Sequence, residues 1–175
     1  MEGFGKKTQS KTKVNNKIVK APKEQLINKA IKFHLEGNIQ EASKYYQYCL
    51  DQGFNDQRVF SNYGVILKNL GNLQEAEFFT RKAIEINPNF AEAHSNLGVI
   101  LKDLGKLKEA ELSYRKAIEI NPNFAEAHSN LGDILNDLSK YKEAKDSWFK
   151  AIELEPNLKG TVEQLARRLY LDRQY

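Results

Sequence analysis

The chain has 175 residues, of which 41% are hydrophobic and 29% are charged, a balance typical of a folded protein with a large polar surface. Its single cysteine excludes an intrachain disulfide framework and a multi-cysteine zinc site. No apolar run approaches the roughly 18 residues that a membrane-spanning helix needs, and the start of the chain lacks the apolar segment of a secretory signal. We therefore predict no membrane span and a cytoplasmic protein.

The net charge of +4 is unevenly distributed along the chain. Seven lysines and one acid, Glu2, lie within the first 23 residues, which therefore carry +6 and leave −2 for the rest. Residues 1–22 combine this charge with low hydrophobicity and no sustained apolar period, so we expect a disordered basic tail. The tail is either a solubilising extension or a segment that contacts nucleic acid or an anionic surface through charge alone.

From residue 23 onward, the sequence repeats with a period of 34 residues. Residues 81–98 and 115–132 both read RKAIEINPNFAEAHSNLG. When each unit is numbered from position 1 to position 34, small residues recur at positions 8, 20 and 27. A period of this length indicates stacked supersecondary units. The units begin at Lys23, Gln57, Ala91, Ala125 and Lys159.

Each unit predicts two helices. Positions 4, 7, 8 and 11 recur at helical intervals and form the apolar face of a first helix, helix A. Positions 17, 20, 24, 27 and 28 form the buried face of a second, helix B. Glycine at position 15 permits the turn between them, and Asn-Pro at positions 31 and 32 ends helix B, because proline disfavours helical geometry in the preceding residue. The small residues at positions 8, 20 and 27 allow the helices to pack closely.

This pattern resembles that of the tetratricopeptide repeat (TPR) family, over residues 23–175 with a constant period and no gaps. The resemblance implies an all-α, right-handed solenoid of helix-turn-helix repeats. The last segment is either a capping helix or helix A of an incomplete fifth repeat in a longer parent protein. The predicted organisation is a basic tail (1–22), a degenerate first repeat (23–56), three further repeats (57–90, 91–124 and 125–158) and the C-terminal helix (159–175).

The resemblance also implies that the A helices line a concave face, where most TPR ligands bind as peptides. Position 6 of helix A is asparagine in four units and glutamine in the fifth. A carboxamide offers one acceptor and two donors, which suit the backbone of an extended peptide. With A helices roughly 10 Å apart and a rise of about 3.3 Å per peptide residue, one amide would meet about every third residue. We define the asparagine ladder as Asn28, Asn62, Asn96, Asn130 and Gln164.

The asparagine ladder resembles the one in the TPR region of the O-linked N-acetylglucosamine transferases. The alternative is that asparagine is only a polar residue tolerated on a wet inner wall. Positions 9 and 12 also fall on the expected concave face, and they differ between the nearly duplicated third and fourth units. Val99 and Lys102 become Asp133 and Asn136, which either tunes the side-chain preference of the groove or reflects drift after duplication.

Other kinds of site fit the sequence poorly. The carboxylate clamp of chaperone-binding TPR proteins uses lysine at position 5 and asparagine at position 9 of one unit, asparagine at position 6 of the next, and basic residues at both positions 2 and 6 of a third. Of these three requirements, only the asparagine at position 6 is met here. His94 and His128 are predicted to be structural, because residues one repeat apart cannot share a zinc ion. Cys49 is predicted to be a buried thiol, and the pair Glu109 and Glu111 to lie on a solvated outer face. We expect no cofactor and no metal or catalytic site.

The function predicted from these features is that of a non-enzymatic scaffold, which binds a protein or an extended peptide in the concave groove. The alternative is the substrate-recruiting TPR part of a protein glycosyltransferase, or of another transferase, whose catalytic domain lies outside this chain. Neither the identity of the ligand nor the oligomeric state follows from the sequence.

Overall fold

The computed structural model describes residues 22–172, and this part of the chain contains nine helices and no strand. The expected all-α fold class is confirmed. The predicted basic tail lies outside the described residues, apart from Pro22. None of the helices described is both long and apolar enough to span a membrane. The helices are α2 (Lys23–Leu35), α3 (Ile39–Asp51), α4 (Gln57–Asn69), α5 (Leu73–Ile86), α6 (Ala91–Asp103), α7 (Leu107–Ile120), α8 (Ala125–Asp137), α9 (Tyr141–Leu154) and α10 (Lys159–Asp172).

The helices group into two compact units, which divide between Asn55 and Asp56. The first unit holds α2 and α3, which pack against each other. Ala30 at position 8 of α2 and Tyr46 at position 24 of α3 are both fully buried. The predicted burial of Cys49 is confirmed, since the thiol is buried on α3.

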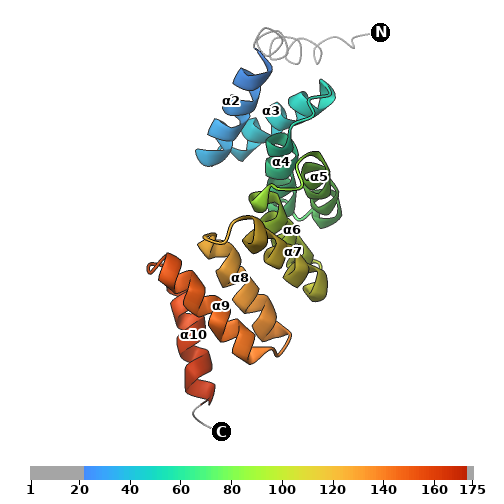
Figure 1. Ribbon diagram of the computed structural model, residues 1–175. Coiled ribbons are helices and arrows are strands. Elements are labelled where there is room, and N and C mark those ends of the chain that lie inside the picture. The colour runs from blue at the N-terminus through green and yellow to red at the C-terminus, as the bar shows by residue number, and fades with distance from the viewer. Residues whose placement is uncertain (1–21, 173–175) are drawn as a thin grey trace, which may run out of the picture. The chain divides into compact units, whose positions relative to one another are not determined.

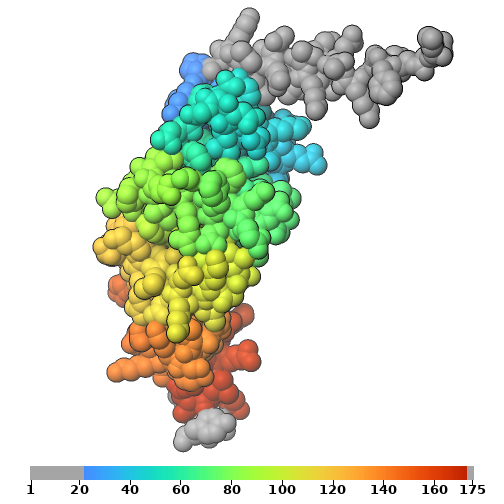
Figure 2. All heavy atoms as spheres, turned by 90° about the vertical axis from the view of Figure 1, so that its right-hand side faces the viewer, coloured from blue at the N-terminus to red at the C-terminus, as the bar shows by residue number. Residues whose placement is uncertain are grey.

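The second unit consists of three helix pairs and a final single helix. Helices α4 and α5, α6 and α7, and α8 and α9 each pair as helix A and helix B, and α10 packs against α9. Successive pairs stack through α5 on α6 and α7 on α8, and the A helices α4, α6 and α8 also contact one another in order. Figures 1 and 2 show this succession from green through yellow to red.

Two local features end the helices at the predicted positions. Helices α2, α4, α6 and α8 each end in a tight turn in which, for example, the Gly71 N–H donates to the Lys68 carbonyl and the Asn72 N–H donates to the Leu67 carbonyl. Such a turn needs a left-handed backbone at position 15, where φ is 82° at Gly71. Helices α5 and α7 end before Asn-Pro and α9 ends before Glu-Pro. At Asn87, for example, the extended backbone (φ −135°, ψ 94°) is the geometry that the following proline favours.

Position 15 of the fourth repeat is the exception, because Ser139 occupies the left-handed region there with φ 62°. We expect Ser139→Gly to raise the free energy of unfolding by about 0.5–1 kcal/mol, since glycine relieves the steric cost of this conformation but loses more entropy on folding. Urea titration of the two proteins measures the change. The matched variant Gly105→Ala, at φ 75° in the preceding repeat, should lower the same free energy. Equal stability of Ser139→Gly and the wild type would contradict the prediction.

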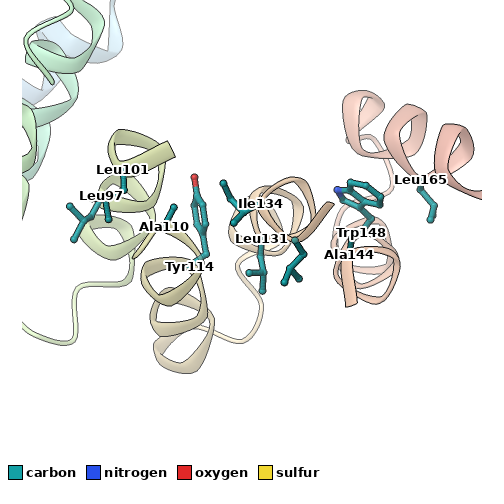
Figure 3. Packing of buried hydrophobic residues seen from close by; sticks show 10 residues of the cluster. Leu97, Leu101, Ala110, Tyr114, Leu131, Ile134, Ala144, Trp148 and Leu165 are labelled. Carbon is teal, nitrogen blue, oxygen red and sulfur yellow. The ribbon is translucent and has the colours of Figure 1, made fainter. Parts of the chain in front are cut away.

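One hydrophobic cluster runs through helices α6 to α10. Figure 3 shows Leu131 and Ile134 of α8 lying between the rings of Tyr114 and Trp148, both of which are buried. The two rings occupy position 24 of helix B and lie directly over the glycine at position 8 of helix A. A Cβ at Gly98 would lie 2.7 Å from the Tyr114 ring, and a Cβ at Gly132 would lie 2.4 Å from the Trp148 ring. The small residue at position 8 is therefore a packing requirement.

The B helices are joined by ion pairs that cross from one repeat to the next. The carboxylate of Glu111 on α7 lies 2.9 Å from Arg115 of the same helix and 2.8 Å from Lys140, in the turn between α8 and α9. Glu77, one repeat earlier, pairs in the same way with Arg81 and Lys106.

The prediction of a solvated outer face is therefore wrong for Glu111, which is buried, although it describes the exposed Glu109 correctly. The reason is that position 21 faces the turn of the following repeat. Burial raises the pKa of Glu111, but hydrogen bonds from Lys140 and Arg115 outweigh this effect and hold the pKa below its usual value.

Candidate functional site

The second unit places three asparagines of the ladder at equivalent points of adjacent A helices. Asn62 on α4, Asn96 on α6 and Asn130 on α8 are all half-buried, and these three helices contact one another in order. Gln164 follows on α10 and is exposed. We call the surface that carries these amides the A-helix face. In the first unit, Asn28 lies exposed on α2.

The amides differ in their internal hydrogen bonds. The Nδ2 atom of Asn96 donates to the Oγ atom of Ser61 on the preceding A helix, at 3.1 Å. Ser61 is itself buried, so this bond fixes the orientation of the Asn96 amide and leaves its Oδ1 atom and second N–H for another partner. Within residues 22–172, the side chains of Asn62 and Asn130 make no hydrogen bond.

Positions 9 and 12 have unequal surroundings in the third and fourth repeats. Val99 is half-buried and packs against the hydrophobic cluster, whereas Lys102 is exposed. Asp133 is half-buried, and its Oδ1 atom accepts a hydrogen bond from Nε1 of Trp148 at 3.0 Å. Burial raises the pKa of Asp133, and the bond from Trp148 and the charge of Lys102 offset this rise only in part. Asp133 therefore has an internal partner that the sequence reasoning missed.

Two adjoining pockets lie where α8 meets α10, and both are lined by Gln164. One has a volume of about 230 Å³ and is also lined by Asn136, Trp148 and Arg167. The other has a volume of about 350 Å³ and is lined by residues that include Ser129, Asp133 and Thr161. The structure thus brings together three residues that were predicted separately: Asp133, Asn136 and Gln164.

Sequence reasoning missed Arg167 and Thr161, which also line these pockets. The available signal was the repeat numbering, because Arg167 occupies position 9 of the fifth unit, as Asp133 does in the fourth. Thr161 lies at position 3, and its hydroxyl is 2.6 Å from that of Ser129. This contact links α8 to α10, as the bond between Asn96 and Ser61 links α6 to α4.

The histidines that repeat at position 4 join helix A to the turn before it. Nε2 of His94 donates to the Pro88 carbonyl at 2.9 Å, and Nε2 of His128 donates to the Pro122 carbonyl at 3.0 Å. These bonds give both rings the structural role predicted for them. In the part of the chain that the structure describes, no group of three or more histidine, cysteine or acidic side chains is arranged to hold a metal ion.

Many solved structures share the fold, and three of them illustrate the similarity at low sequence identity. A structure from a functional characterisation of Pseudomonas aeruginosa pilF has a TM-score of 0.79 and 21% identity, covering 87% of this chain and 70% of that one. YrrB, described as a TPR protein with an unusual peptide-binding site, has a TM-score of 0.67 and 24% identity, covering 77% and 70%. The first TPR of Spaghetti (RPAP3), bound to the HSP90 peptide SRMEEVD, has a TM-score of 0.65 and 24% identity, covering 66% and 92%.

Comparison with sequences gives the family. No protein of curated function matches the chain. One tetratricopeptide repeat model matches residues 57–90, and a second matches residues 91–124 and 125–158. Together these matches span more than half of the sequence and coincide with the helix pairs of α4 to α9. The chain belongs to the tetratricopeptide repeat family.

Proposed function

We propose that this protein is a non-enzymatic interaction scaffold that binds an extended peptide along its A-helix face. The observation that carries the proposal is the row of half-buried amides on α4, α6 and α8, in which Asn62 and Asn130 make no hydrogen bond within residues 22–172. These amides are partly exposed to water, so a ligand that replaces this water gains about 0.5–1.5 kcal/mol for each hydrogen bond. The backbone of a peptide supplies both donors and acceptors at regular spacing.

The remaining predicted positions would add side-chain preference to this backbone recognition. In the proposal, Gln164 continues the row on α10, while Asn28 on α2 is an exposed amide that the first unit offers by itself. Val99 and Lys102 would favour different ligand side chains from those favoured by Asp133 and Asn136, one repeat later. The two pockets beside Gln164 give this end of the face room for such side chains.

Peptide binding by related folds supports the proposal. YrrB is described as having a peptide-binding site, and the Spaghetti repeat was solved with a bound peptide. The alternative function, recruitment of substrates for a glycosyltransferase or another transferase, requires the same peptide-binding surface and has no further observation in its favour. The cytoplasmic location and the contact of the basic tail with nucleic acid or an anionic surface stay predictions.

The experiment selects peptides from a random twelve-residue display library on the full chain and measures their dissociation constants by fluorescence anisotropy. We expect the double variant Asn62→Ala with Asn130→Ala to bind every selected peptide at least tenfold more weakly, since each lost hydrogen bond contributes about 1 kcal/mol. The loss should not depend on the peptide's side chains, because the amides contact its backbone.

The matched control is Asn89→Ala with Asn123→Ala, which removes two exposed asparagines from the turns before α6 and α8. This control should bind as the wild type does. Equal affinities for the wild type and the Asn62 and Asn130 double variant would refute the asparagine ladder. Failure to select any peptide would contradict the scaffold function itself.

A further inference from the structure

The last helix of the second unit exposes an apolar stripe. Among the described residues, six of the ten large hydrophobic side chains that are exposed lie between Tyr141 and Leu171. On α10, Val162 is 42% exposed and Leu169 is 39% exposed, and Ala166 between them is also exposed. Spacings of four and three residues place these side chains on one face of the helix. We call Val162, Ala166 and Leu169 the end stripe.

Two of the three equivalent positions, 8 and 11, are covered by helix B in the earlier repeats, whereas position 4 is a half-buried histidine on α6 and α8. Position 11 is Leu101 on α6 and Leu135 on α8, and these side chains are only 1% and 0% exposed. Position 8 in the same helices is the glycine beneath the Tyr114 or Trp148 ring. The end stripe therefore continues the interface between helix A and helix B that three helix pairs of this unit already form.

Phe149 on α9 is a further exposed apolar side chain of the last helix pair. In the two preceding repeats its position, 25, is arginine, and each arginine pairs with a glutamate of the next helix B: Arg81 with Glu109, and Arg115 with Glu143. Position 25 thus faces the place that a following helix B occupies. Phe149 is 53% exposed there, so a helix that covers α10 would meet an apolar ring where the internal helices meet a charge.

We propose that the end stripe and Phe149 bind an amphipathic helix of a partner protein, seated on α10 as helix B is seated on helix A. The repeats define its chemistry. It carries small residues seven apart, as in the fully buried pair Ala76 and Ala83. It carries an apolar residue, in place of glutamate, against Phe149. The partner residue that lies over Ala166 must leave room for the Cβ of that alanine, whereas Trp148 leaves no room for a Cβ at Gly132.

A second copy of this chain fits the end stripe less well. Its B helices α5, α7 and α9 are already packed within their own repeats, and position 19 in them is Glu75, Glu109 and Glu143, which would face Phe149. If the second copy used its own end stripe instead, its residues seven apart would be Val162 and Leu169, and both are larger than the alanines of helix B. Close helix packing favours small residues at such crossings.

The probe is a fluorescein-labelled peptide that copies residues 72–87, which include α5, with Glu75→Leu to meet Phe149. This helix is chosen because its position 24 is Thr80, the smallest residue at that position in the repeats. We expect saturable binding to the full chain in fluorescence anisotropy. Val162→Glu with Leu169→Glu should weaken that binding at least about tenfold, because charge replaces the apolar contact at the centre of the interface.

Three controls separate the possible outcomes. The two substituted residues are exposed, so the thermal unfolding of the variant, followed by circular dichroism, should match that of the wild type. A peptide with Ala76→Arg and Ala83→Arg should not bind. The chain with Asn62→Ala and Asn130→Ala should bind the probe unchanged, which distinguishes this surface from the proposed peptide groove.

Three results would overturn the inference. The first is the absence of binding, and the second is binding that the Val162 and Leu169 substitutions leave unchanged. The third is a dimer of the wild-type chain in sedimentation velocity that dissociates on these same substitutions, because the occupant would then be a second copy of this chain and not a partner helix.

Discussion

Gly132→Ala is expected to lower the free energy of unfolding by about 2 kcal/mol, since overpacking a dense core costs more than alanine gains in helix propensity. The added Cβ would lie 2.4 Å from the ring of Trp148, which is 1% exposed. A shift of the ring would also stretch its hydrogen bond to Asp133. Urea titration followed by tryptophan fluorescence reports both changes, because Trp148 is the single tryptophan of the chain.

The matched control is Gly160→Ala, in the first turn of α10, where an added Cβ meets nothing within 4 Å. This variant should be as stable as the wild type or slightly more stable. Adding Trp148→Tyr to Gly132→Ala should recover part of the loss in a urea titration followed by circular dichroism, because positions 8 and 24 of the first unit combine Ala30 with Tyr46, both fully buried. A Gly132→Ala protein of wild-type stability would show that the ring has room to move and that position 8 tolerates a methyl group.

The helices were predictable because the signals that place them are local. Each of them acts within a few residues of its own position: glycine at position 15, Asn-Pro at positions 31 and 32, and the periodic apolar residues. Even the exception at Ser139 keeps the left-handed turn, because the same pair of backbone hydrogen bonds closes it. The repeat period then extended these local signals across the chain, with three of the predicted units matching known repeat models.

The partners of polar side chains were not predictable in the same way, because they lie 15 to 35 residues apart in sequence. Asn96 bonds to Ser61, and Trp148 bonds to Asp133. A signal for the second pair was present. A buried indole N–H requires an acceptor, and aspartate at position 9 occurs only in the repeat that carries tryptophan at position 24. The change from Val99 in the third repeat to Asp133 in the fourth therefore has a structural reason, the hydrogen bond to Trp148. This reason differs from the two that the sequence suggested, ligand preference and drift after duplication.

The ion pairs between B helices lead to a prediction about acid stability. Glu111→Gln is expected to lower the free energy of unfolding at neutral pH by about 2 kcal/mol, less than for a fully buried pair, because Arg115 and Lys140 are 44% and 43% exposed. The folded pKa of Glu111 lies below the ordinary value of 4.5. The stability that the ionised Glu111 contributes is therefore fully present above pH 4.5, and this stability is lost as the pH falls through the folded pKa of Glu111.

Urea titrations of the wild type and Glu111→Gln at a series of pH values test both the size and the sign of this effect. The difference in stability should be constant above about pH 5.5 and should shrink below pH 4.5. Glu143→Gln is the matched control, because Glu143 pairs with the same Arg115 but is exposed, and exposed pairs contribute about 0–1 kcal/mol. Two outcomes would contradict the prediction: equal losses of stability in the two variants, or a difference for Glu111→Gln that grows as the pH falls. Either outcome would mean that position 21 does not join successive repeats through charge. The stacking of the B helices would then rest on apolar contacts alone.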